Sequence, residues 1–170
     1  IINKIKHNQN TKFDIDLTYI TSRGPWYFNS WKGDDLKSGG LVTNIGIHFF
    51  DLLVYIFGKC TEIVVHLKEN NKSSGYIELE RARIRWFLSI DQNDLPFNLE
   101  KNTKTFRSIE INNEQFDLSY KFNDLHEICY KEILSGKGFT TDTVRESINI
   151  VSAIRNNGIE NKKDKHPFLR

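Results

Sequence analysis

The segment 41–57 constrains the fold of this chain more than any other, because it is apolar almost all round and is followed by Gly58. Such a segment is typical of a helix buried inside a domain, with the glycine as its C-terminal cap. It is too short and too polar for us to expect a membrane span. Its polar residues Asn44, His48 and Asp51 are four and three positions apart, which places them on one face of an α-helix. Because buried polar groups are costly unless paired, this stripe is expected to face hydrogen-bond partners or a cavity.

Alternating apolar and polar residues predict β-strands on both sides of this helix. We expect strands at 13–19, 62–67, 76–80, 83–90 and 104–109. In the hairpin that these strands are expected to form, basic residues of the fourth strand lie opposite acidic residues of the third. Such charges usually form cross-strand ion pairs or line a subunit interface. These residues are Glu78, Glu80, Arg81, Arg83 and Arg85.

Two amphipathic helices are predicted near the end of the chain. The apolar residues that share a face are Phe122, Leu125, Ile128, Cys129 and Ile133 in the first helix, and Val144, Ile148, Val151 and Ile154 in the second. Thr143 and Glu146 match a capping box for the second helix, and residues 162–166 are expected to form a solvated basic tail. Together these elements predict one α+β domain over residues 1–170, with a mostly antiparallel open sheet covered on one face by helices.

Charge and cysteine content limit the classes of partner. Lys and Arg number 24 against 22 Asp and Glu, and a net charge of +2 predicts neither a nucleic-acid nor a membrane partner. Cys60 and Cys129 are isolated and no secretory leader pattern precedes them, so we expect buried free thiols and a cytoplasmic location. The chain opens on Ile1 as if partway through a helix, which indicates a fragment of a longer protein.

The stretch 21–40 interrupts the apolar rhythm and predicts a long ordered loop, a kind usually kept for function. Aromatic rings in it suit the flat faces of sugars and nucleobases, while its cations suit phosphates and carboxylates. The candidate binding residues are Arg23, Trp26, Tyr27, Lys32 and Lys37. The alternative is that the aromatic residues only anchor the loop and the charges are solvated.

Two interpretations of His48 follow from the sequence. It is either a core histidine whose partners are Asn44 and Asp51, or a general base at the wall of a pocket, with Asn44 orienting a substrate hydroxyl. An imidazole suits the second task because its unperturbed pKa, about 6.5, is close to working pH.

Cofactor motifs are weak in this chain. His126 and Cys129 have helical spacing, but no second pair at ligand spacing accompanies them, so no metal site is expected. The nearest match to a dinucleotide fingerprint starts at Gly136 and has Thr141 in place of the third glycine. The chain alone is therefore not expected to bind NAD in the usual way.

The helix and the residues before it resemble a known family. Residues 37–40 read Lys-Ser-Gly-Gly and residues 44–51 read Asn-Ile-Gly-Ile-His-Phe-Phe-Asp, a pattern similar to the catalytic helix of Gfo/Idh/MocA oxidoreductases. The stretches 17–24, 75–83 and 86–90 resemble the branch that oxidises UDP-N-acetylglucosaminuronic acid at C3.

The resemblance implies a two-domain protein of which only the C-terminal half is present here. The missing N-terminal Rossmann domain would bind NAD and supply an assisting lysine, and the open sheet would mediate a homodimer or homotetramer. His48 would be the catalytic histidine, and Asn44 would contact the sugar near its reacting hydroxyl. Many relatives carry Asp four residues before the histidine; with Asn44 there instead, proton transfer would depend more on His48 and that lysine.

The implied product is a 3-keto nucleotide sugar for surface polysaccharide such as lipopolysaccharide, with Arg23, Lys32 and Lys37 at the diphosphate or uronate. Without the first domain, the fragment is expected to be inactive. The alternatives are a dehydrogenase of the same family for another sugar or cyclitol, and a non-catalytic sugar-binding or oligomerisation module.

Overall fold

The computed structural model describes residues 11–97, 99–100, 102–116, 125–138 and 140–169. Its centre is a six-stranded open sheet in the order β2-β3-β4-β1-β5-β6. The strands are β1 (Phe13–Thr21), β2 (Cys60–Lys68), β3 (Lys72–Leu79), β4 (Ala82–Ser89), β5 (Thr105–Ile111) and β6 (Glu114–Phe116). Among the six described strands, β1 and β4 alone pair in parallel, so the sheet is mixed but mostly antiparallel. The predicted α+β class and open sheet are confirmed.

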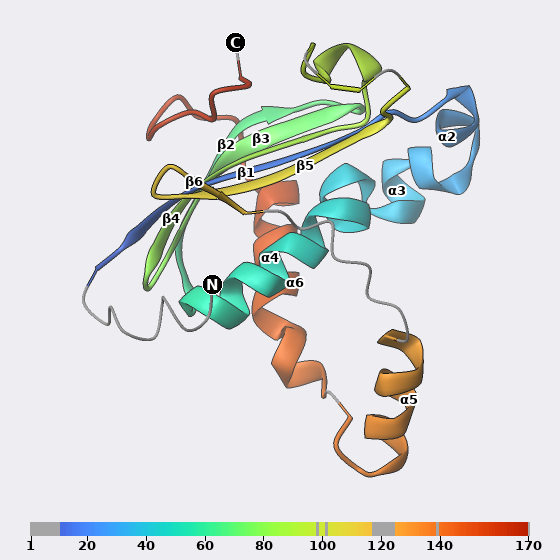
Figure 1. Cartoon of the computed structure of the whole chain (residues 1–170), viewed down its shortest axis with the longest axis vertical. Coiled ribbons are helices and arrows are strands. Elements are labelled where there is room, and N and C mark those ends of the chain that lie inside the picture. The colour runs from blue at the N-terminus through green and yellow to red at the C-terminus, as the bar shows by residue number, and fades with distance from the viewer. Residues whose placement is uncertain (1–10, 98, 101, 117–124, 139, 170) are drawn as a thin grey trace.

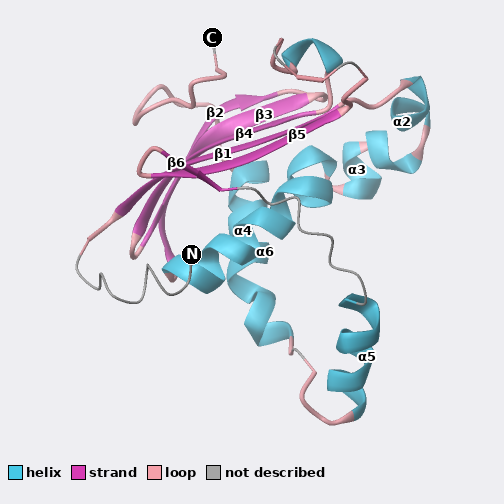
Figure 2. Ribbon diagram, viewed as in Figure 1, coloured by secondary structure: helices cyan, strands magenta, loops and turns pink. Residues whose placement is uncertain are grey.

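Helices cover one face of this sheet (Figure 2). They are α4 (Ile47–Phe57) and α6 (Thr141–Asn156), and α4 is preceded by a π-helical turn, η2 (Val42–Gly46). The ring of Phe57 lies 5.6 Å from that of Phe13, and the ring of Phe49 lies 5.2 Å from that of Tyr19. Because the two pairs run in opposite order along the chain, α4 lies antiparallel to β1.

Only one side of α4 is buried, so the prediction of a helix enclosed all round is wrong. Phe50, Leu53 and Phe57 pack into the core, whereas Leu52 is partly exposed and the Tyr55 side chain is 81% exposed. A helix whose sequence is apolar almost all round can therefore still expose one side to solvent. The consequence is that α4 presents a solvent-facing surface to which His48 belongs.

The run from Asp35 to Phe57 is long and apolar enough to cross a membrane by length and composition alone. This run is longer than the segment 41–57, which by itself is too short for a membrane span. Gly39 and Gly40 interrupt it with φ of 78° and 75°, and its second part packs on the sheet. A helix of a domain core passes the same test of length and composition, so this run is weak evidence of a membrane span.

The stretch predicted as a long loop contains three short helices. They are α2 (Pro25–Asn29), the 3-10 turn η1 (Trp31–Gly33) and α3 (Asp35–Ser38). Pro25 occupies the first turn of α2, and Asp34 caps α3 by accepting from the backbone N–H groups of Leu36 and Lys37. Each helix is too short to show a 3.6-residue apolar repeat, which is why the periodicity did not reveal them.

The last two helices differ from the prediction in detail. α6 begins at Thr141, so Thr143 lies inside the helix and its hydroxyl donates to the Thr140 carbonyl. Glu146 accepts a hydrogen bond from the Cys60 backbone N–H at 2.9 Å, so the capping box is wrong.

The preceding helix, α5 (Leu125–Leu134), stands apart from the sheet and from α4 (Figure 1). Ile128 and Ile133 on it are more than half exposed, and Cys129 is a free, exposed thiol. The expectation of a buried Cys129 is therefore wrong, whereas Cys60 is free and half-buried. Phe122 lies outside the described residues.

The end of the chain crosses the other face of the sheet: residues 162–165 are exposed, as expected of a solvated tail, but His166 is buried. Glu160 N–H donates to the Val65 carbonyl at 2.8 Å, and the imidazole of His66 contacts the Lys162 carbonyl at 2.8 Å. His166 is 2% exposed, lies 3.1 Å from the Thr18 hydroxyl and stacks on Phe87. The basic composition of 162–166 did not predict that His166 is buried, because a single histidine in a short polar stretch is usually solvated.

Candidate active site on the first turn of α4

His48 lies on the first turn of α4, and its side chain is exposed. Phe50 and Leu53 set the orientation of this helix by packing into the core. His48 is therefore not a core histidine, and its ring is available to a ligand. This position fits the general-base interpretation better than the structural one.

Asn44 lies in the π-helical turn η2, four residues before His48. In η2 the Ile47 N–H donates to the Val42 carbonyl, five residues back, where an α-helix would use four. A Cβ on Gly46 would lie 2.9 Å from Phe50 and 3.0 Å from Leu88, so the turn packs closely on β4. No residue pattern predicted this widened turn, which is a feature frequent at functional sites.

Asn44 is tied to the preceding loop. Its amide nitrogen lies 3.5 Å from the Lys32 carbonyl, at the outer limit for a hydrogen bond, and the Ser38 hydroxyl donates to the same carbonyl at 2.9 Å. Burial raises the pKa of Tyr27, while a side-chain hydrogen bond with Asn44 acts in the opposite direction. Tyr27, Lys32 and Asn44 therefore form one connected group beside His48.

Tyr27 and the other aromatic candidates differ in accessibility. The Tyr27 ring is 4% exposed, so it can reach a ligand only through its hydroxyl. Trp26 is exposed, and the Arg23 guanidinium lies over its ring at 5.9 Å. Trp31, which was not chosen as a candidate, is equally exposed and has the Lys32 ammonium over its ring at 5.8 Å.

Lys37 has a carboxylate partner within the loop. Its ammonium lies 3.2 Å from Asp34 Oδ2, and the hydrogen bond with Lys37 is the main reason that the pKa of Asp34 is lowered. Any anion bound by Lys37 would have to compete with Asp34. Arg23 and Lys32 of this loop contact tryptophan rings instead of a carboxylate in the described structure.

Asp51 does not join the polar stripe. It accepts a hydrogen bond from the Ser147 hydroxyl of α6 at 2.9 Å. The expected stripe of three residues is therefore reduced to Asn44 and His48, because Asp51 turns toward the neighbouring helix. Ser147 could not be found from the sequence, since nothing in its spacing indicates a partner 96 positions away.

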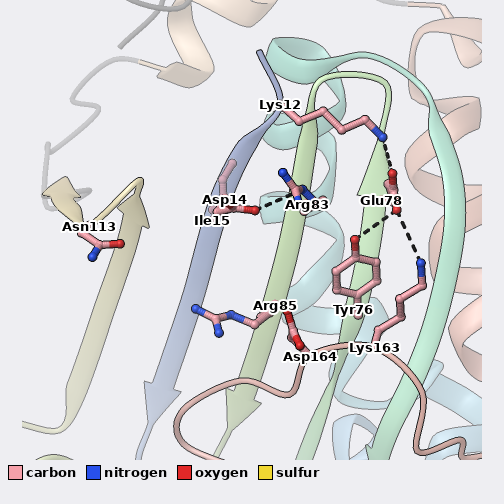
Figure 3. Close-up of a pocket in the computed structure, with 10 residues that line it drawn as sticks. All are labelled: Lys12, Asp14, Ile15, Tyr76, Glu78, Arg83, Arg85, Asn113, Lys163 and Asp164. Carbon is pink, nitrogen blue, oxygen red and sulfur yellow. Dashed lines mark hydrogen bonds and ion pairs between the residues drawn. The ribbon is translucent and has the colours of Figure 1, made fainter.

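The charged residues of the β3–β4 hairpin form a separate cluster on the outer face of the sheet (Figure 3). Arg83 lies opposite Glu78 in the sheet, as predicted. Its ion pair is nevertheless with Asp14 of β1 at 3.2 Å, and Glu78 pairs with Lys12 and Lys163. The predicted ion pairs between β3 and β4 are therefore wrong in their partners, because β1 lies beside β4 and supplies carboxylates.

Within the part of the chain that the structure describes, no group of three or more His, Cys, Asp or Glu residues is arranged to hold a metal ion.

These features define a class: an α+β domain with an open sheet and an exposed histidine on its covering helix. The model of the C-terminal alpha/beta domain of the Gfo/Idh/MocA oxidoreductase family matches residues 10–149. The chain therefore belongs to this family, as the resemblance predicted.

Solved structures agree. The chain is 42% identical to the WlbA (WbpB) dehydrogenase from Thermus thermophilus, with a TM-score of 0.92 to its complex with NAD and alpha-ketoglutarate and 0.91 to that with NAD and UDP-GlcNAcA. Each match covers 99% of this chain and 55% of that protein. WlbA from Bordetella pertussis, in complex with NADH and UDP-GlcNAcA, shares only the fold, at 16% identity and a TM-score of 0.64 over 96% of this chain and 59% of that protein. The chain thus spans little more than half the length of the solved relatives it matches.

Proposed function

We propose that this chain is the substrate-binding and catalytic half of an NAD-dependent dehydrogenase that oxidises the C3 hydroxyl of UDP-N-acetylglucosaminuronic acid. The observation that carries the proposal is 42% identity over 99% of the chain to a dehydrogenase whose structure holds NAD and UDP-GlcNAcA. The exposed His48 beside Asn44 supplies the chemistry that such a reaction needs.

In the proposed reaction His48 is the general base. Its neutral imidazole accepts the proton of the C3 hydroxyl as the hydride leaves the same carbon, and the C3–O bond becomes a carbonyl. Bound NAD supplies the hydride acceptor. Asn44 orients the hydroxyl through its amide, and its contacts with Tyr27 and Lys32 hold that amide in place.

The rest of the substrate would lie along the loop before α4. Arg23 and Lys32 would meet the diphosphate in this proposal, and Trp26 offers an exposed ring face. Lys37 contributes only if its pair with Asp34 opens. NAD would be held mainly by an N-terminal domain outside this chain, so we expect residues 1–170 alone to be inactive.

We further propose a cytoplasmic homodimer or homotetramer that uses the outer face of the sheet and works in surface polysaccharide synthesis. The paired charges of both signs on that face, including Arg83 with Asp14, suit a self-complementary contact. Sedimentation of the longer protein at several concentrations tests it: a monomer at all of them contradicts the proposal.

The function is tested with a protein that joins this chain to its dinucleotide-binding domain. NADH absorbance should rise with NAD and UDP-N-acetylglucosaminuronic acid, and His48→Ala should abolish the rise. No signal with this sugar but turnover of another sugar or cyclitol would favour a sibling dehydrogenase. Binding without any turnover would favour a non-catalytic module, and full activity of His48→Ala would remove His48 from the mechanism.

A further inference from the structure

Arg107 of β5 lies on the helix-covered side of the sheet, level with the first turn of α4. It is opposite Tyr19 in the antiparallel pairing of β1 and β5. Its guanidinium carbon lies 5.3 Å from the centre of the Tyr19 ring, and that ring lies 5.2 Å from Phe49, the residue after His48. The neighbours of Arg107 on the strand, Phe106 and Ser108, face the other side of the sheet, as alternation along a strand requires.

The guanidinium of Arg107 has no acidic partner in the described part of the chain. Among residues that the structure describes, no carboxylate forms an ion pair with Arg107, whereas Arg85 binds Asp16 through two contacts of 2.6 Å. Arg107 is also exposed. It is therefore a cation that is oriented by an aromatic ring and available to an anion from outside the chain.

We infer that Arg107 binds the carboxylate of the sugar whose hydroxyl faces His48. This inference rests on the proposed function and deepens it. A guanidinium presents a planar fork of N–H donors that matches a carboxylate in two parallel hydrogen bonds. In a uronic acid the carboxylate and the C3 hydroxyl belong to the same ring, so one sugar can face His48 and a cation on the sheet side of α4.

Two anionic groups of the substrate then meet two separate sets of cations. Lys32 and Arg23 belong to the loop before α4, next to Asn44 and Trp26, and suit the diphosphate. Arg107 comes from the sheet and suits the sugar acid. It is thus a specificity-determining residue, because it favours a uronic acid over the uncharged sugar that carries a hydroxymethyl group at the same carbon.

The sequence concealed this residue because its contacts are remote. Arg107 follows Tyr19 by 88 positions and lies in a strand where a lone arginine usually means a solvated face. Only the pairing of β5 with β1 brings it to the level of His48.

The test compares binding of two ligands by titration calorimetry, in the longer protein with NAD present. UDP-N-acetylglucosaminuronic acid should bind wild type more tightly than UDP-N-acetylglucosamine. Arg107→Gln should weaken binding of the acid about 10- to 100-fold and leave the uncharged sugar within about 2-fold. Arg107→Lys should fall between, since it keeps the charge without the fork. Arg145→Gln, at an exposed position of α6, is the control and should change neither affinity.

Three results would overturn the inference: equal affinities of wild type for both ligands, equal weakening of both by Arg107→Gln, or no weakening. Equal weakening would mean that Arg107 only supports Tyr19. NADH formation is measured separately, so a protein that binds the acid through Arg107 but does not oxidise it would contradict the dehydrogenase proposal alone.

Discussion

Ser147 on α6 donates a hydrogen bond to Asp51 on α4, and so links the last helix to the helix that carries His48. Ser147 is 1% exposed. Ser147→Ala should lower the free energy of unfolding by about 1–2 kcal/mol, because a half-buried carboxylate loses its donor. Urea unfolding measures the change. Ser152→Ala on an exposed position of the same helix is the control, and equal effects of the two variants would contradict the assigned role.

A side chain at Gly40 should be destabilising for two reasons, the strained backbone and the carboxylate of Asp35, which would have to move. Its φ is 75°, and an added Cβ would lie 2.5 Å from Asp35 Oδ1. We expect Gly40→Ala to destabilise the protein by more than the roughly 1–2 kcal/mol that the left-handed backbone costs alone. Gly136→Ala provides the comparison, since φ there is 76° and nothing lies within 4 Å. Calorimetric melting should give a lower Tm for Gly40→Ala than for Gly136→Ala; the opposite order would refute the steric argument.

His166 should make stability depend on pH. Burial, with the Arg85 charge as a smaller cause, lowers the pKa of His166 to about 3. The unfolded chain binds this proton below about pH 6.5, whereas the folded chain does not. The contribution of the neutral, buried His166 to the free energy of unfolding is therefore complete above about pH 6.5. It decreases as the pH falls toward about 3.

His166→Gln should remove this part of the slope when the free energy of unfolding is plotted against pH. Thr18→Val, which removes the hydroxyl beside the ring and keeps the imidazole, should lower stability and retain the slope. Parallel curves for wild type and His166→Gln would show that the proton is not excluded from the fold.

Asn44 should affect catalysis without supporting the fold. Asn44→Ala removes the amide that contacts Tyr27 and the Lys32 carbonyl, so a hydroxyl at His48 is held less well. We expect kcat/KM of the longer protein to fall by about 10- to 100-fold with little change in Tm. Asn29→Ala, at the exposed end of α2, is the matched control. Unchanged kinetics would leave Asn44 without a role in positioning.

The sequence predicted those elements whose signal is local. β1 and the first half of β4 alternate clearly, and the core-facing side of α4 follows from its apolar content. β6 is three residues long and polar, so no alternation could reveal it. The parallel pairing of β1 with β4 joins Phe13 to Ala82, and no local pattern specifies such a register.

The arrangement of the candidate residues was predicted where they share one segment and missed where it depends on other contacts. Asn44 and His48 are neighbours on one segment, so their spacing was enough to find them. Asp51 was misplaced because its orientation depends on Ser147, and Lys37 was judged available because its pairing with Asp34 depends on the turn that α3 makes. A tertiary contact therefore decided the difference at Asp51, whereas the short turn of α3 decided the difference at Lys37.

The position of β1 has a consequence for the order of events on the ribosome. This strand is made first, yet it lies between β4 and β5, whose residues begin at Ala82 and Thr105. While the chain is being translated, Ile15 and Leu17 have no neighbour to pair with until those later strands emerge. The adjacent strands β2, β3 and β4 can assemble on their own as successive hairpins. We therefore expect that meander to form before β1, and β1 to need protection from aggregation in the nascent chain.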